Sequence, residues 1–271
     1  MSRNLRSGFA EINGARLYYE IAGSGRPLVM LHSHLLDSGQ WDEQVAYFAT
    51  TRQVIRYDAR GFGQSDLPPV PFAYYKDLHG LLLYLGIDQA DFIGCSGGGM
   101  TNLDFAVTYP QMVGKLILVG TAVSGYRPTT PPPPIMLAMN QARHNGEINL
   151  AVELSLQGLT DGPQRQPHEV DPAVRERTRA MTAKLFTRPP IPEAIPDWPD
   201  PPAAERLSTI SAPTLALIGA EDQPPLHEMT DIVVDRMPNA RKVVIPNAGH
   251  HPNMEQPVLF HAAVEEFLSP K

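Results

Sequence analysis

The chain has 271 residues, one cysteine and a formal net charge of −7, with a sequence pI of about 5.7. That length is enough for one large α/β domain with an insertion, and the acidic balance argues against nucleic acid or an anionic membrane as the main partner. A single cysteine excludes an internal disulfide, and the basic start (residues 1–6) leads into no long apolar run, so we expect a cytoplasmic protein without a secretion signal or a transmembrane span.

The first predicted element is a hairpin, because residues 9–12 and 17–21 flank an Asn13-Gly14 pair that is typical of tight turns. Short apolar runs then predict buried strands at residues 28–31, 54–57, 92–93, 116–119, 214–218 and 243–245. Helical patterns separate most of these strands, at residues 41–49, 75–85, 98–109, 227–237 and 258–268. The alternation predicts an α/β fold: a mostly parallel central sheet, helices on both faces and the hairpin at one edge.

Between Thr121 and Ala204 this alternation stops. Proline-rich runs at residues 128–134 and 189–202 bound three helical patterns, at residues 135–144, 146–158 and 171–187. Asp171 before Pro172 suits a helix start, and the spaced apolar residues favour a packed helical unit over a disordered insert. We expect core residues 1–122, a helical cap at 123–204 on stiff proline-rich hinges, and core residues 205–271.

The run from Gly94 to Gly98 predicts a nucleophile elbow centred on Ser96, a strained strand-to-helix turn with glycine two residues before and two after the serine. Such a turn exposes the hydroxyl at the carboxyl end of a strand, where the next helix aims its N-terminal amides. Cys95 as nucleophile would place β-branched Ile93 at a crowded position, so we expect Cys95 to pack. A phosphate loop is disfavoured because no lysine follows the glycines. Ser96 is therefore the candidate nucleophile.

A serine nucleophile needs a base, and the base needs an orienting partner. On a parallel sheet both should follow the carboxyl ends of strands. Asp222 follows the strand at 214–218 and is the candidate acid, with Glu221 as the alternative. His250 follows the last predicted strand and is the candidate base.

His250 is preferred over its neighbour His251 for a local reason. Gly249 lets the loop turn inward immediately before His250, and Pro252 is expected to direct His251 outward. For the oxyanion, the backbone amide of Gly97 and that of His34, in the loop after residues 28–31, are the candidate donors.

These motifs resemble the α/β-hydrolase family, specifically its capped serine esterases and lactonases, including enol-lactonase-like and acyl-homoserine-lactonase-like members. The matching segments are residues 31–34, 58–65, 94–98, 219–222 and 247–250, and the likeness runs from about Gly8 to Phe267, weakest in the cap. The resemblance implies the α/β-hydrolase fold and the order Ser96, Asp222, His250. In two departures, Ser33 replaces a common glycine, as in the enol-lactonase branch, and Gly97 replaces a frequent bulky residue, which is expected to leave room beside the oxyanion hole.

The expected function is hydrolysis of carboxylic esters or lactones with short-to-medium acyl groups, through an acyl-enzyme. The expected partner is that small substrate, with no cofactor, nucleic acid or membrane, and the protein is expected to be a monomer or homodimer. No metal is expected either, since the segment from His32 to Asp37 has its aspartate one residue late for a metal-lactonase motif and no histidine after it. Perhydrolysis, thioester hydrolysis and C–C bond hydrolysis stay open, and a catalytically silent receptor is the alternative of another class.

Four cap residues are candidates for an apolar acyl pocket: Met136, Met139, Phe186 and Trp198. Such residues also commonly form the core of a cap, so the sequence leaves both interpretations open.

Overall fold

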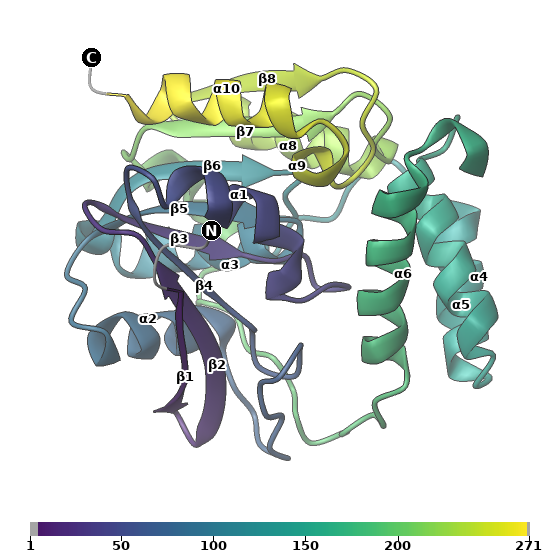
Figure 1. Ribbon diagram of the computed structural model, residues 1–271, viewed down its shortest axis with the longest axis horizontal. Coiled ribbons are helices and arrows are strands. Elements are labelled where there is room, and N and C mark those ends of the chain that lie inside the picture. Colours follow the sequence, from purple (N-terminus) through teal and green to yellow (C-terminus); the bar gives the residue numbers. More distant parts are fainter. Residues whose placement is uncertain (1–4, 270–271) are drawn as a thin grey trace.

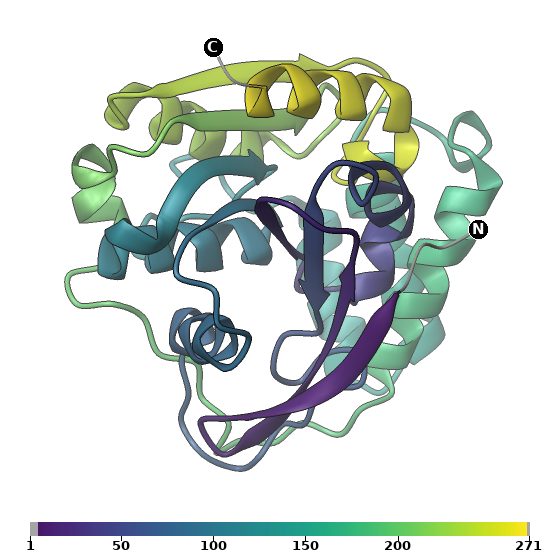
Figure 2. The ribbon, with the colours of Figure 1, turned by 60° about the vertical axis from the view of Figure 1, so that its left-hand side comes forward.

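The computed structural model describes residues 5–269, in which eight strands form one sheet in the order β1-β2-β4-β3-β5-β6-β7-β8. Their bounds are β1 (Arg6–Ile12), β2 (Ala15–Ala22), β3 (Pro27–Leu31), β4 (Gln53–Tyr57), β5 (Ala90–Cys95), β6 (Val113–Val119), β7 (Thr214–Gly219) and β8 (Ala240–Ile245). β2 runs antiparallel to both β1 and β4, and the other neighbouring strands are parallel. The predicted hairpin therefore forms one edge of a mostly parallel sheet, and β8 forms the other (Figure 2).

The local sequence explains both kinds of strand. Asn13 and Gly14 have positive φ angles of 48° and 77°, as the tight turn between β1 and β2 requires. β5 and β7 are buried along their whole length, which is why they appear in the sequence as continuous apolar runs rather than alternating ones.

Helices cover both faces of the sheet (Figure 1). α1 (Asp42–Phe48) and α10 (Pro257–Leu268) pack on one face, while α2 (Tyr74–Tyr84), α3 (Gly97–Thr108) and α8 (Pro224–Arg236) pack on the other. The shorter helices of the core are η1 (Ser38–Trp41), η2 (Pro110–Met112), α7 (Ala203–Arg206), η5 (Leu207–Thr209) and α9 (Pro252–Glu255). Within residues 5–269, no helix has the length and apolar character needed to cross a membrane.

A helical insert lies between β6 and β7, beside the carboxyl ends of the parallel strands (Figure 1). It comprises α4 (Pro134–His144), α5 (Ile148–Ser155), η3 (Leu156–Asp161), η4 (Pro167–Glu169) and α6 (Pro172–Phe186). The Asp171 carboxylate caps α6 by accepting the Ala173 N–H at 2.8 Å. The second helix differs from the pattern at 146–158, because it ends at Ser155 and continues as the π-helix η3.

The two ends of this insert meet at Ser124. Its hydroxyl oxygen accepts the N–H of Ala203 at 3.1 Å, and its carbonyl oxygen accepts the N–H of Ala204 at 3.0 Å. We propose residues 123–204 as the cap, with 1–122 and 205–271 as the two parts of the core, because this contact closes the insert at its base.

Candidate active site

Ser96 lies between β5 and α3 with φ 54° and ψ −116°, a backbone conformation that residues other than glycine rarely adopt. Its N–H donates to the Val119 carbonyl at 2.8 Å, which fixes the turn. A Cβ at Gly94 would lie 2.5 Å from the Gly98 carbonyl oxygen, and one at Gly98 would lie 2.5 Å from that of Leu31. Glycine is therefore required on both sides of Ser96, as the elbow pattern predicts.

Cys95 points into the apolar core on the face of the sheet that α1 and α10 cover. Its Sγ donates to the His250 carbonyl oxygen at 3.6 Å. Burial raises the pKa of the thiol to about 12, so the nucleophilic thiolate is scarce at neutral pH. These surroundings favour Ser96, not Cys95, as the nucleophile.

His250 and Asp222 form a buried pair at the carboxyl ends of β8 and β7. His250 Nδ1 lies 2.9 Å from Asp222 Oδ2 and 3.1 Å from Oδ1, and both side chains are almost fully buried. Nδ1 therefore carries the hydrogen, assigned from this contact, and Nε2 is left as the basic nitrogen. Glu221 makes a different contact, since its backbone N–H donates to the Ala248 carbonyl at 2.8 Å.

The expected outward orientation of His251 is wrong. Its side chain is buried, and its ring packs edge-to-face on that of His250 with 5.1 Å between centroids. The physical reason is that α9 starts at the next residue: the His251 carbonyl accepts the N–H of Met254 and of Glu255, and this first turn directs the ring inward. Burial lowers the pKa of His251 well below its ordinary value, so the ring is neutral.

The loop after β3 presents the second predicted oxyanion donor. The Ser33 N–H donates to Gln40 Oε1 at 2.8 Å, which sets the path of the chain into His34. Among residues 5–269, no acceptor is paired with the backbone N–H of His34 or of Gly97. Both amides are thus available to a ligand.

The predicted extra room beside Gly97 is absent, because the His34 side chain fills it. A Cβ at Gly97 would lie 2.2 Å from His34 Cγ. The imidazole is stacked on Phe62 and tilted against Tyr74, with centroid distances of 5.2 and 4.6 Å. Burial lowers the pKa of His34 to about 3, so the ring that fills the space beside Gly97 is neutral.

A buried group of three amide side chains joins this loop to the segment after His250, and sequence reasoning missed it. Asn253 Nδ2 donates to the Gln40 carbonyl and to Gln44 Oε1, both at 3.0 Å, and Gln40 Nε2 donates to Asn253 Oδ1 at 3.2 Å. Gln40 and Gln44 are four residues apart and therefore lie on the same side of the helical segment near Trp41. Two amides on one side of an apolar helical pattern were the sequence signal that could have indicated this group.

Ser96 and His250 face one cavity of about 610 Å³ between the sheet and the insert. No hydrogen bond joins them among the described residues, and such contacts commonly tighten only when substrate binds. The cavity is lined by Ser33, His34, Leu35, Ser96, Pro128, Thr130, Pro132, Pro133, Met136, Met139, Asn140, Leu159, Gln223, Pro225, Leu226, Met229 and His250. No Lys, Arg, Asp or Glu is among these lining residues, all of which lie in the described part of the chain.

The four candidate pocket residues divide into two pairs. Met136 and Met139 line the cavity. Phe186 does not: it is buried in the cap's own core against Met139 and Val152, while Trp198 is 40% exposed and also lies outside the cavity. The proline run beginning at Pro128 forms part of the cavity wall, in addition to linking the cap to the core.

Histidine nitrogens occur at two further places where an ion could bind. His32 has both ring nitrogens engaged, with Nε2 accepting the Ala59 N–H at 3.0 Å and Nδ1 at 2.7 Å from the Ser33 carbonyl oxygen. Cys95, His250 and His251 place donor atoms within 4.8 Å of one another, and His250 also contacts Asp222 through Nδ1.

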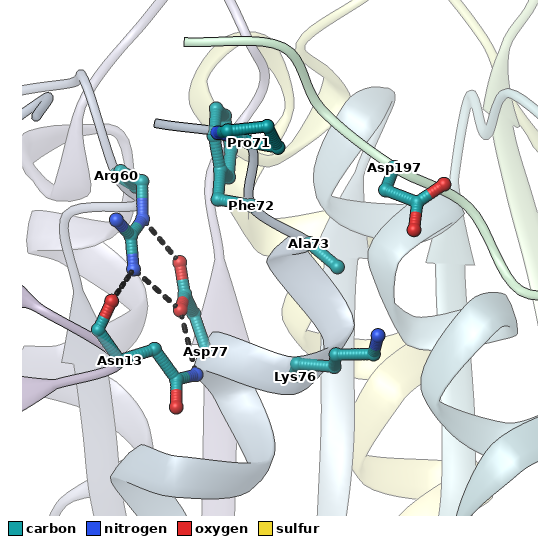
Figure 3. A pocket seen from close by; sticks show the side chains of 8 residues that line it. All are labelled: Asn13, Arg60, Pro71, Phe72, Ala73, Lys76, Asp77 and Asp197. Atoms are coloured by element: carbon teal, nitrogen blue, oxygen red, sulfur yellow. Dashed lines mark hydrogen bonds and ion pairs between the residues drawn. The ribbon is translucent and has the colours of Figure 1, made fainter. Parts of the chain in front are cut away.

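A second cavity, of about 310 Å³, lies beside the Arg60–Asp77 ion pair (Figure 3). Arg60 donates to the two carboxylate oxygens of Asp77 at 2.7 and 2.8 Å, and to the Asn13 carbonyl at 3.1 Å. This pair ties the β1–β2 turn to α2 and balances the charge of the guanidinium.

Comparison with known proteins places these features in a family. A 2-hydroxy-6-oxononadienedioate/2-hydroxy-6-oxononatrienedioate hydrolase of Burkholderia vietnamiensis is 30% identical, over 93% of this chain and 91% of its own length. A 3-oxoadipate enol-lactonase 2 of Acinetobacter baylyi is 27% identical, over 93% and 92%. The solved structure of Est816, an N-acyl homoserine lactone degrading enzyme, has a TM-score of 0.76 and 28% identity, covering 96% of this chain and all of that one. Residues 28–263 match the alpha/beta hydrolase family, to which this chain belongs.

Proposed function

We propose that this protein is a serine hydrolase that cleaves carboxylic esters or lactones through an acyl-enzyme. The observation that carries the proposal is a single arrangement: Ser96 on its strained turn and the Asp222-held imidazole of His250 face one uncharged cavity. A serine hydroxyl next to an oriented base is the requirement for this nucleophilic chemistry.

The proposed reaction starts when Ser96 Oγ attacks the ester carbonyl carbon and His250 Nε2 takes the hydroxyl proton. Asp222 stabilises the resulting imidazolium through Nδ1–H. The amides of Gly97 and His34 donate to the oxyanion of the tetrahedral intermediate. His250 then protonates the leaving alcohol, and a water molecule activated by the same imidazole hydrolyses the acyl-enzyme and restores Ser96.

The lining of the cavity supports an uncharged acyl group of short to medium length. Met136, Met139 and Leu226 contribute apolar surface, and no lining residue supplies a cation for a substrate carboxylate. This favours neutral esters and lactones over an anion such as the dioate for which the Burkholderia relative is named. A lactone fits the same machinery, because only the tethering of its leaving alcohol differs from an open ester.

The test is a comparison of wild type with Ser96→Ala and, as a matched control one residue away, Cys95→Ala. We expect wild type to hydrolyse p-nitrophenyl esters and to be labelled by a fluorophosphonate at Ser96. Ser96→Ala should lose about 10⁴-fold in kcat and all labelling, because the nucleophilic oxygen is gone. Cys95→Ala should retain labelling and most activity.

Retention of a tenth of the activity by Ser96→Ala would contradict the nucleophile assignment. An unlabelled wild type that binds but does not turn over esters, neutral lactones or thioesters would instead indicate a silent receptor. Perhydrolysis and C–C bond hydrolysis would use the same groups, and a substrate panel measured with the labelled enzyme separates them.

A further inference from the structure

The π-helix η3 directs its carbonyl groups at the two loops that carry Asp222 and His250. The Leu159 carbonyl accepts the backbone N–H of His250 at 3.0 Å, and the Gly158 carbonyl accepts the side-chain amide of Gln223, the residue after Asp222. Both carbonyls belong to the last four residues of the helical segment, which ends at Asp161, and backbone carbonyls at this end of a helix have no partner within it. The same segment also lines the cavity, through Leu159.

Arg165, which follows η3, extends this contact. Its guanidinium donates to the Asp161 carbonyl at 2.7 Å and to the Thr160 carbonyl at 2.8 Å, both within the cap. It also donates to Glu255 Oε2 at 2.7 Å and to the Asn247 carbonyl at 3.2 Å, both in the core. One side chain thus joins the end of η3 to both sides of the His250 loop.

Glu255 completes the connection on the side of the core. Its side chain is 3% exposed, and Oε1 accepts the Gly249 N–H at 2.9 Å while Oε2 accepts from Arg165. Burial raises the pKa of Glu255 to about 7, and the neighbouring guanidinium opposes that rise. The carboxylate therefore links the cation of the cap to the residue immediately before His250.

The contact leaves no free space at Gly249. A Cβ there would lie 2.7 Å from the Leu159 carbonyl oxygen, 2.8 Å from that of Thr160 and 2.9 Å from Arg165 Nη2. The His250 loop is thus packed directly against the cap, and glycine is required at position 249 for this close approach.

We propose that Arg165 and Glu255 are positioning residues, which hold the His250 loop against η3 so that the docked cap fixes the place of the base. The inference rests on the proposed function and adds that the cap, besides forming the pocket, controls the chemical step. Displacing a reacting group by 1 Å can cost about 10²-fold in rate, so loss of the bridge should lower kcat.

The chain supplies a matched control in Arg177, which also joins the cap to the core but at a different place. From α6 it donates to the Gly39 carbonyl at 3.1 Å and to Glu43 at 3.0 Å, and none of its partners belongs to the His250 loop. Arg165→Met and Arg177→Met therefore each remove one cap-to-core guanidinium.

The experiment measures kcat and KM for a p-nitrophenyl ester, and the rate of fluorophosphonate labelling at Ser96, well below the melting temperature of each variant. For Arg165→Met we expect kcat and the labelling rate to fall together by about 10- to 10²-fold with KM nearly unchanged. Arg177→Met should retain both rates within about twofold. Equal rates in the two variants, or a loss confined to KM, would overturn the proposal.

A second pair keeps the test decisive if Arg165→Met does not fold. Lysine retains the charge but cannot spread donors over four acceptors, so Arg165→Lys should lose part of kcat and Arg177→Lys none. Wild-type kcat in Arg165→Lys would then overturn the proposal. A wild-type enzyme that the fluorophosphonate does not label would overturn the proposed function as well, whereas labelled wild type with equal variants overturns only the positioning role.

Discussion

At the scale of single residues, adjacent carboxylates have different surroundings. Asp222 contacts His250 Nδ1 at 2.9 Å, whereas the backbone N–H of Glu221 donates to the Ala248 carbonyl. Asp222→Asn should lower kcat by about 10⁴-fold, because the amide cannot hold the imidazole in the required tautomer. Glu221→Gln, measured with the same ester, should remain close to wild type. If Glu221→Gln is the more damaging of the two, the acid is one residue earlier than we assign it.

The His34 ring fills the space that a side chain at position 97 would need. We therefore expect the effects of substitutions at the two positions to depend on each other. Gly97→Ala should push the His34 ring and with it an oxyanion amide, costing up to about 10²-fold in kcat. In a His34→Ala background the space is free, so the same Gly97→Ala change should cost little. Additive losses in the double variant would show that the ring and the glycine do not interact.

The amide of His34 can be tested apart from its ring. His34→Ala retains the backbone N–H and should keep most of the activity, while His34→Pro removes that donor and should fail. Comparable kcat in these two variants would mean that the loop after β3 does not supply an oxyanion donor.

At the scale of elements, α4 contributes to the wall of the cavity, whereas the last residue of α6 packs in the core of the cap. Met136 lines the cavity and Phe186 is 3% exposed in the cap core. Met136→Ala should therefore shift the preferred ester chain length with a small change in kcat on the acetate. Phe186→Ala should cost about 3–5 kcal/mol of unfolding free energy instead. A chain-length profile unchanged in Met136→Ala would place specificity outside α4.

The elements that carry the site could be predicted because each depends on a few consecutive residues. The Ser96 turn needs glycines at fixed offsets, and the loops after β7 and β8 follow short apolar runs. Strand bounds were less accurate where a charge lies inside a strand. β5 begins at Ala90, before Asp91, whose buried carboxylate binds Arg26 and Arg52, whereas a charged residue in the sequence suggests a boundary.

The features that the sequence did not predict depend on contacts between distant segments. Arg165 meets Glu255 across 90 positions of chain, and no local pattern marks either residue. The same holds for Phe186, whose burial depends on how α4, α5 and α6 pack together. The position of His251 depends on where α9 begins.

At the scale of the whole molecule, a buried chain of hydrogen bonds connects helix α3 to both ends of the cap. The Ser124 hydroxyl donates to Asp104 on α3 and accepts the Ala203 N–H. Burial raises the pKa of Asp104 from 3.8 to about 7, so the folded protein holds a proton there that the unfolded chain releases above pH 4. The stabilisation from this proton is fully present below pH 4 and is lost as the pH rises through 7.

This sign predicts how Asp104→Asn changes stability with pH. Asparagine does not titrate, so the unfolding free energy of the variant relative to wild type should rise by about 2–3 kcal/mol between pH 5 and pH 8, because each pH unit below the folded pKa is worth about 1.4 kcal/mol. Urea unfolding of both proteins at the two pH values measures this difference and cancels the other titrating groups. Asp66→Asn is the control. The hydrogen bond from Arg16 lowers the pKa of Asp66, so this carboxylate is ionised in the folded and the unfolded protein between pH 5 and pH 8. The difference in unfolding free energy between Asp66→Asn and wild type should therefore stay constant. If the Asp104→Asn difference is equally constant, Asp104 is ionised in the folded protein and the chain from α3 to the cap is held by charge instead of by a shared proton.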